Sequence, residues 1–325
     1  MVTAPWSGSA LVERAGTVVD ELAEGFVDEA TGTRWSARTR SQASSISKQV
    51  VAVVALALAD RGDVDLHAPV GRVLPSAPSA WAPMTLHHLL THTSGVGHWS
   101  ELGLAPLTGD PPSPGDLVDL VLRTPLVGAP GGRWLYSSPG YAVAALLLES
   151  ATQATYAALA TELALAPAGL RSTTTGVFGL GADQPSSRAV AHGHHEGRPV
   201  HVAPGLAALP GTGDLWTTTE DLVAWSRALG DGAVLREPER LWARRAELPP
   251  DLSAGSVVGE AYGYGTFSGT VLGRPAWFVP GDNPGYASLL ARMTGDATTI
   301  AVLADDDAAG TGPALARLAP SSNRG

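Results

Sequence analysis

The 325-residue chain contains no cysteine, and its longest uninterrupted apolar run, residues 50–59, has ten residues. The missing cysteine excludes disulfide bonds, thiolate catalysis, iron–sulfur clusters and cysteine-ligated zinc. The apolar run is too short for a bilayer, which requires about 20 residues, so we expect a buried helix there. The N-terminus lacks the charged segment and apolar stretch of a secretion signal. We therefore expect a cytoplasmic protein with no membrane partner.

Basic residues are in the minority, 21 against 31 acidic ones, and the net charge is −10. No basic block is present that could follow a phosphate backbone, which argues against nucleic-acid binding. Of the 21 basic residues one is lysine, Lys48, and the other 20 are arginine. Arginine stays protonated at ordinary pH, whereas lysine can lose its proton when it is desolvated. A single retained lysine therefore indicates a position where a neutral amine is needed.

Strand patterns at both ends of the chain flank a mostly helical middle. Apolar stretches typical of strands occur over 9–28 and at 262–267, 276–279, 286–293 and 299–304. Helical patterns occupy 43–60, 85–92, 114–123, 139–150, 153–164 and 218–230, and a last short helix is expected at 312–318. We predict an α+β fold, in which an antiparallel sheet domain of residues 1–42 and 255–325 is interrupted by a mostly helical domain of residues 43–254.

Ser45 and Lys48 stand three residues apart at the predicted start of a helix, so their side chains share one face. A serine hydroxyl is a weak nucleophile until a base removes its proton, and a neutral lysine amine can be that base. The backbone N–H groups of a helix start also favour negative charge nearby. The alternative is that Ser45 caps the helix and Lys48 extends to solvent.

The chain resembles the serine β-lactamase and penicillin-binding-protein superfamily, especially its class C-like branch of esterases, D-aminopeptidases and acyltransferases. The nucleophile segment is similar to residues 43–49, and Leu-Leu-Thr-His-Thr-Ser-Gly stands at 89–95. The family's tyrosine loop is similar to 130–141, a later helix start to 213–222, and the third active-site strand to 281–286. The order and spacing agree from about residue 10 to 305.

This resemblance implies that Ser45 is the acylated nucleophile, Lys48 its general base, and Tyr136 the phenol that relays protons to the leaving group or activates the second acceptor. It places the oxyanion hole at the backbone N–H groups of Ser45 and Asp282. The site would lie between the two domains and use no metal or organic cofactor. The remaining residues that we expect to contact a small-molecule substrate are Ser138, Val279, Gly281, Asn283 and Trp277.

Two positions depart from the family's pattern. Ser138 replaces the asparagine of Tyr-x-Asn, so one hydroxyl stands in for an amide. Val279, in Val279-Pro280-Gly281, replaces the lysine or histidine of the family's Lys/His-x-Gly triad and supplies no positive charge. Pro280 also removes a strand donor, which would limit pairing with an extended peptide. These departures argue against recognition of penicillins or D-Ala-D-Ala.

Several histidines and tryptophans are further candidates for site residues. His192, His194, His195 and His201 resemble a metal cluster, but a loop at the surface or substrate rim is the favoured interpretation. His92 is interpreted as a core histidine with satisfied hydrogen bonds. Trp99, Trp134 and Trp277 could line a pocket for an apolar acyl group.

The sequence therefore predicts a serine hydrolase or acyltransferase that forms an acyl-Ser45 intermediate with a small ester, thioester or amide. One alternative is a binding or structural protein that keeps the fold without catalysis. Another is a β-lactamase or D-Ala-D-Ala carboxypeptidase.

Overall fold

The fold is built around an antiparallel sheet of nine strands. The computed structural model describes residues 6–28, 31–103, 114–175, 191, 193–195, 198–200, 209–250 and 252–322. The strand order is β10-β11-β12-β13-β14-β15-β1-β2, and β9 pairs with β11. The strands of this sheet are β1 (Gly8–Arg14), β2 (Thr17–Glu24), β9 (Ala246–Glu247), β10 (Ser253–Ala254), β11 (Val257–Tyr262), β12 (Phe267–Val271), β13 (Arg274–Asn283), β14 (Tyr286–Met293) and β15 (Thr299–Ala304).

Three short strand pairs lie outside this sheet: β3 (Phe26–Asp28) with β4 (Thr33–Arg34), β5 (Ser41–Gln42) with β8 (Trp216–Thr217), and β6 (Gly193–His195) with β7 (Arg198–Val200). The α-helices are α1 (Ser47–Arg61), α2 (Leu86–Leu90), α3 (Pro114–Arg123), α4 (Ser138–Thr152), α5 (Tyr156–Ala160), α7 (Thr219–Gly230) and α8 (Gly312–Ser322). Single turns of 3₁₀-helix occur at η1 (Ser44–Ile46), η2 (Val70–Arg72), η3 (Ser79–Trp81) and η5 (Pro238–Arg240), and a π-helical turn, η4 (Thr161–Leu165), follows α5.

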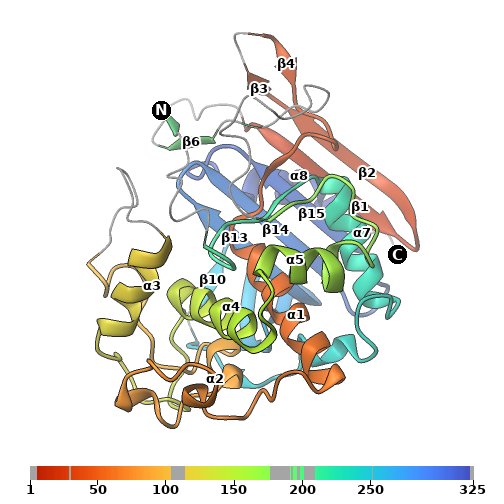
Figure 1. Ribbon diagram of the computed structural model, residues 1–325. Helices are drawn as coiled ribbons and strands as arrows, with labels where there is room; N and C mark the ends of the chain where they lie inside the picture. The colour runs from red at the N-terminus through yellow and green to blue at the C-terminus, as the bar shows by residue number, and fades with distance from the viewer. Residues whose placement is uncertain are drawn as a thin grey trace.

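The two faces of the sheet bury two separate apolar cores, because successive side chains of a strand point to opposite faces. On one face Leu290 and Leu303 pack with the helices of the middle of the chain. On the other face Leu289 and Val302 pack with Leu315 of α8. Figure 1 shows α1, α5 and α7 in front of strands β13–β15.

Helix α1 is buried around its whole circumference from Ser47 to Leu56, as a helix enclosed on every side by protein should be. It ends at Gly62, whose φ of 80° is the left-handed conformation that closes many helices. The apolar run at 50–59 is thus the buried helix predicted from the sequence. Within the described residues, no helix is long and apolar enough to cross a membrane.

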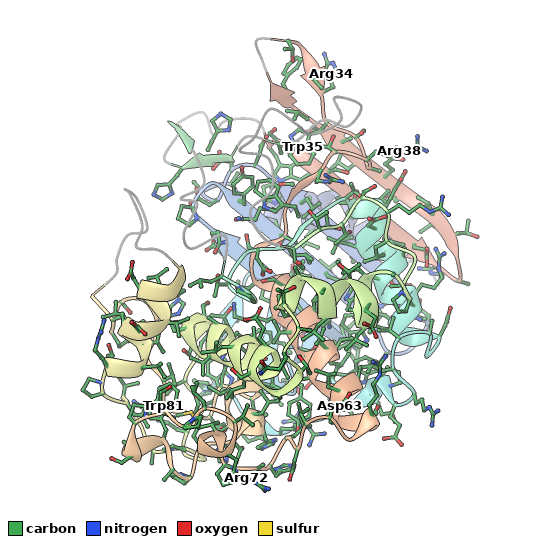
Figure 2. All side chains as sticks on the ribbon, in the orientation of Figure 1. Arg34, Trp35, Arg38, Asp63, Arg72 and Trp81 are labelled. Carbon is green, nitrogen blue, oxygen red and sulfur yellow. The ribbon has the colours of Figure 1, made fainter. Side chains whose placement is uncertain are left out.

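The β3–β4 hairpin projects from one end of the molecule (Figure 1), and Trp35 ties the segment that follows it to the sheet. The indole Nε1 of Trp35 donates to Asp305 Oδ2 at 2.9 Å. Figure 2 shows Arg34 and Trp35 at this end, and Asp63 and Arg72 at the opposite, helical end. Arg34 on the hairpin stacks over the Phe26 ring at 4.7 Å.

The predicted fold class, an antiparallel sheet flanked by helices, is confirmed, and strands β14 and β15 have the predicted bounds. The strand expected at 262–267 is wrong, because Tyr262 ends β11, Phe267 begins β12, and residues 263–266 form the turn between them. Gly263 N donates to Thr266 O at 2.9 Å and Gly265 has a φ of +64°, so the backbone reverses there. Strands β9 and β10 precede residue 255, and the division into two domains stays a prediction.

Candidate active site

Ser45 lies in the single turn η1 that leads into α1, and this turn is fixed on both sides. Ser44 adopts a φ of +48°, a left-handed conformation that is costly for a residue with a side chain and is typical of functional turns. The hydroxyl of Ser47 donates to Ser44 O at 2.7 Å. The hydroxyl of Ser288, on β14, donates to Ala43 O at 2.8 Å. Ser45 is therefore held between the sheet and the start of α1.

The hydroxyl oxygen of Ser45 accepts two hydrogen bonds, from Lys48 Nζ at 3.0 Å and from Tyr136 OH at 2.7 Å. Lys48 is only 1% exposed, and its Nζ lies 5.0 Å from the centre of the Tyr136 ring and 5.8 Å from that of Tyr141. Among the described residues, no carboxylate forms an ion pair with Lys48. Ser45 makes no side-chain cap for α1. The alternative of a helix cap and a solvent-exposed lysine is therefore wrong.

Two interlocked loops place Tyr136 beside Ser45. Leu135 N donates to His92 O at 2.8 Å, and Ser137 N donates to His92 Nδ1 at 3.1 Å. The Ser137 hydroxyl caps α4 by accepting from Gly140 N at 2.9 Å, and it donates to Gly97 O at 3.0 Å. The tyrosine is thus fixed by both of its chain neighbours.

His92 supports this tyrosine from the core and does not contact the nucleophile. It is 1% exposed, and its ring centre lies 4.5 Å from that of Tyr136, 5.0 Å from Tyr141 and 4.8 Å from Tyr262. Burial, with help from Lys48, holds its pKa well below the usual value. Because Nδ1 accepts from Ser137, the proton of the neutral ring is on Nε2, which is buried without a hydrogen-bond partner in the described part of the chain. The predicted core histidine is confirmed, but only one of its nitrogens is satisfied.

Strand β13 closes the site from the sheet side. A Cβ on Gly281 would lie 2.6 Å from Ala43 O and would collide with Ser288 Oγ. Glycine is therefore required for the strand to approach the nucleophile turn. Pairing with β12 covers Arg274–Phe278, whereas pairing with β14 continues to Asn283. The last residues of β13, including Asp282, thus line the cavity beside Ser45, and the oxyanion role of the Asp282 N–H stays a prediction.

A cavity of about 850 Å³ opens over Ser45 and is lined by Tyr136, Ser138, Gly281, Asp282 and Asn283, among others. No lysine or arginine belongs to its lining in the described part of the chain. Asp307 lines it, and the Asp307 Oδ2 lies 2.5 Å from His195 Nδ1. Burial and the neighbouring Asp307 raise the pKa of Asp282 above its usual value. The described lining therefore offers no lysine or arginine side chain that could pair with a substrate carboxylate.

The amide of Asn283 is engaged within the protein. Its Nδ2 donates to Gln42 Oε1 at 3.0 Å and to Thr212 O at 3.4 Å. Asn283 therefore joins the end of β13 to Gln42, three residues before Ser45, and to Thr212. It also lines the cavity.

Trp277 and Val279 require a correction, because neither lines the cavity. Each is 2% exposed and packs in the helix-side core, where Trp277 stacks on Trp242 with ring centres 5.3 Å apart. Strand alternation turns these two side chains away from the cavity and turns Phe278 and Pro280 towards the opposite face. Arg274 does not supply the charge that Val279 lacks, since its guanidinium pairs with Asp296 at 2.7 Å.

Part of the histidine-rich segment forms a pair of short strands next to the cavity wall. Gly193–His195 is strand β6, paired with β7, and not the loop expected from the sequence. His195 contacts Asp307 of the cavity wall, in line with the predicted substrate rim. Within the described residues, no group of three or more potential ligands could hold a metal ion. His192 and His201 lie outside those residues.

His98 lines the cavity and was missed by the sequence reasoning. Its Nδ1 accepts from Ser138 N at 3.2 Å. Burial, followed by the nearby Lys48, lowers its pKa to about 4, so the ring is neutral at pH 7 and carries its proton on Nε2. The only signal in the sequence is its place three residues after the Leu-Leu-Thr-His-Thr-Ser-Gly stretch.

Comparison with known proteins places these residues in a family. The sequence matches the Beta-lactamase family over residues 7–320. Esterase EstB of Burkholderia gladioli is 32% identical over 213 residues, which cover 61% of this chain and 53% of that protein. Penicillin-binding protein 4* of Bacillus subtilis (strain 168) is 22% identical over 322 residues, which cover 93% of this chain and 68% of that protein. The match to EstB thus spans about half of that esterase.

Solved structures share the fold. A penicillin-binding protein from Bacillus halodurans superposes with a TM-score of 0.78 at 22% identity and covers 98% of this chain and 95% of its own. D-Amino acid amidase from Ochrobactrum anthropi SV3, complexed with L-phenylalanine amide, gives 0.82 at 20% identity, with 98% and 95% covered. These matches confirm the predicted fold. The chain belongs to the Beta-lactamase family.

Proposed function

We propose that the protein is a serine hydrolase that forms an acyl-Ser45 intermediate with a small ester, and with modest amides as slower substrates. The observation that carries the proposal is the pair of hydrogen bonds that Ser45 Oγ accepts from Lys48 at 3.0 Å and from Tyr136 at 2.7 Å. A hydroxyl in contact with both an amine and a phenol can lose its proton to one and return a proton through the other.

In acylation, Ser45 Oγ attacks the acyl carbon and its proton passes to the amine of Lys48, which takes part in this step in its unprotonated form. The bond from the acyl carbon to the leaving oxygen then breaks, and that oxygen takes a proton through the Tyr136 hydroxyl. Donors at the backbone N–H groups of Ser45 and Asp282 would stabilise the charge on the carbonyl oxygen. In deacylation, water attacks the acyl carbon and gives a proton to the same base. The bond from the acyl carbon to Ser45 Oγ then breaks, the base returns the proton to Oγ, and the free acid leaves.

The charge of the cavity favours a substrate without a carboxylate. Asp282 and Asp307 line it, and no lysine or arginine belongs to the described lining. Bringing a substrate carboxylate beside these groups would add like charge at short range. We therefore expect ester turnover to exceed that of a penicillin or a D-Ala-D-Ala peptide by a wide margin. Among the relatives, Esterase EstB bears the name of an ester hydrolase, which supports the choice of ester, whereas penicillin-binding protein 4* bears the name of the alternative.

The test is the hydrolysis of p-nitrophenyl acetate by the protein and its Ser45→Ala and Tyr136→Phe variants. Loss of a group that acts in the transition state typically lowers the rate by about 10²-fold or more. Ester turnover that survives in Ser45→Ala would overturn the proposal. Nitrocefin hydrolysis faster than ester hydrolysis would favour the β-lactamase alternative.

Whether another nucleophile replaces water is a separate question that product analysis answers. The acyl-enzyme would be formed in the presence of a simple alcohol or amine, and the products would be separated by mass. Acid as the dominant product identifies a hydrolase. An ester or amide of the added acceptor as the dominant product identifies an acyltransferase of the kind that the sequence resemblance allows.

A further inference from the structure

A second, apolar pocket of about 370 Å³ adjoins the cavity over Ser45. We call it the side pocket, and its apolar wall comes from the tyrosine loop and from β11, β12, β13 and β14. That wall is formed by Trp134, Val257, Phe267, Phe278, Pro280 and Leu289. The rings of Phe267 and Phe278 are stacked, with centres 5.5 Å apart, and Trp134 lies 6.3 Å from Phe267. No charged residue lines the side pocket in the described part of the chain.

The side pocket and the main cavity are continuous at the catalytic tyrosine. Five residues line both: Tyr136, Ala254, Phe267, Pro280 and Thr311. Asp282 and Asn283, at the end of β13, line only the main cavity, whereas Phe278, earlier on the same strand, lines only the side pocket. The oxyanion end and the apolar end of the site therefore lie at different positions along β13, with Pro280, which lines both, between them.

This arrangement distinguishes the two parts of a substrate. Tyr136 is the group that returns a proton to the leaving oxygen, so the leaving group must lie on its side of the acyl carbon. The pocket that opens from Tyr136 away from Asp282 is the side pocket. An uncharged apolar group suits its aromatic and aliphatic wall, because burial of apolar surface is favourable and burial of an unpaired charge is costly.

We propose that the side pocket binds the leaving group of the substrate, the uncharged and apolar alcohol portion of an ester. The inference rests on the proposed function, since it uses the direction of proton delivery in that reaction. Esters of longer aliphatic or of benzylic alcohols are then better substrates than esters of methanol or ethanol.

Two series of esters test the proposal. Ethyl, butyl and hexyl acetates all give the same acetyl-Ser45, so a difference in kcat/KM reports on the alcohol portion alone. Each methylene buried in an apolar pocket is expected to raise kcat/KM by about three- to fourfold. Ethyl acetate, ethyl butyrate and ethyl hexanoate vary the acyl portion instead, and we expect a smaller gain along that series.

A pair of neighbouring substitutions separates the pocket from general effects. Val257 lines the side pocket, and Val258, next on β11, points outward and is 37% exposed. Val257→Trp fills the pocket and should reduce the ratio of hexyl to ethyl acetate turnover to about one, whereas Val258→Trp should keep the ratio of the unmodified protein. Where a thermal melt shows that Val257→Trp does not fold, Leu252→Trp, at the partly exposed rim of the pocket, replaces it.

Binding provides a readout that does not need turnover. We expect 1-hexanol to bind Ser45→Ala in a calorimetric titration, and to bind the Ser45→Ala, Val257→Trp double variant at least tenfold more weakly. Hexanol binding of this kind without hydrolysis of any ester would refute the proposed function and support an apolar pocket for alcohols. If kcat/KM rose along the acyl series instead, and this rise were lost in Val257→Trp, the side pocket would bind the acyl portion and not the leaving group. If turnover were equal along both series and hexanol did not bind, the side pocket would bind neither portion of the substrate, and the proposal would be wrong.

Discussion

At the scale of single residues, Lys48 carries the chemical argument. It is the one lysine beside 20 arginines, it is 1% exposed, and its Nζ donates to Ser45 Oγ. Arginine at this place would keep a positive charge and a donor but could not accept the serine proton, because guanidinium is not deprotonated at ordinary pH. In the proposed reaction the residue at this position must accept a proton, which lysine can do and arginine cannot.

Lys48→Arg should lower kcat for p-nitrophenyl acetate by about 10²-fold or more, since the acceptor of the proton is lost. Initial rates under saturating ester give kcat, and a thermal melt shows whether the variant is folded. Activity within twofold of the unmodified protein, in a folded variant, would mean that Lys48 only supports the structure.

At the scale of elements, the close approach of β13 to the nucleophile turn depends on Gly281. In Gly281→Ala the added Cβ would meet Ala43 O at 2.6 Å and collide with Ser288 Oγ, and these atoms hold the turn before Ser45. Overpacking of this kind costs about 1–3 kcal/mol of unfolding free energy, and displacement of the turn should reduce kcat/KM by at least about tenfold.

The matched control for that variant is Gly295→Ala. Gly295 lies between β14 and β15 with no atom within 4 Å of the added Cβ, and its φ is not in the left-handed region. Urea unfolding and ester turnover of both variants provide the comparison. If the two variants had the same free energy of unfolding and the same ester turnover, β13 could move away from the turn before Ser45 without affecting the site.

Ser137 caps α4 and also holds the loop that carries Tyr136. A matched pair of substitutions can separate these two roles. Ser137→Ala removes the cap on Gly140 N and the bond to Gly97 O, and we expect it to cost about 1 kcal/mol or more of unfolding free energy. It should also lower kcat/KM, because Tyr136 is the preceding residue. Thr155→Ala removes the corresponding cap of α5, where the threonine accepts from Ala158 N.

Urea titrations and ester assays of Ser137→Ala and Thr155→Ala complete this test. We expect similar losses of stability and a loss of activity in Ser137→Ala alone. A parallel decrease of activity in both variants would assign the effect to stability and not to the placement of Tyr136.

The elements show which parts of the site can be predicted from sequence. Ser45 and Lys48 are one helical turn apart, so local geometry alone brings them together. Tyr136 is 91 positions from Ser45, and only the family's motif connects them. The orientation of Trp277 and Val279 could not be predicted, because residues 276–279 are buried on both faces of the sheet and show no polar alternation. His98 belongs to no pattern, since its role arises only where its loop meets the start of α4.

At the scale of the whole molecule, several histidines are built into the fold in the neutral form. Burial lowers the pKa of His87 and of His98 to about 4, lowers that of His92 well below its usual value, and also lowers that of His88. Unfolded histidine titrates near 6.5. Between pH 6.5 and 4 the unfolded chain therefore binds more protons than the folded protein, so the stability present above pH 6.5 is lost as the pH falls.

Two buried carboxyls affect the free energy of unfolding in the opposite direction, because they add stability as the pH falls. Burial raises the pKa of Asp282 and of Asp305, so their contribution is present below the ordinary value of 3.8 and is lost as the pH rises above it. We expect the free energy of unfolding to decrease from pH 7 to pH 5, measured by urea titration in buffers of equal ionic strength. His87→Gln should flatten this slope, while Thr155→Ala, which removes no titratable group, should leave the slope unchanged. An increase in stability from pH 7 to pH 5 would contradict the account of neutral, buried histidines.

Covalent labelling by a fluorophosphonate tests most directly whether Ser45 is an activated nucleophile. The protein would be incubated with the reagent, its intact mass measured, and the modified peptide sequenced by mass spectrometry. We predict one added phosphonyl group, located on Ser45, with labelling absent in Ser45→Ala and slowed by about 10²-fold in Lys48→Arg. A folded protein that gains no mass, or that is labelled equally fast without the lysine, would contradict the claim that Lys48 activates Ser45.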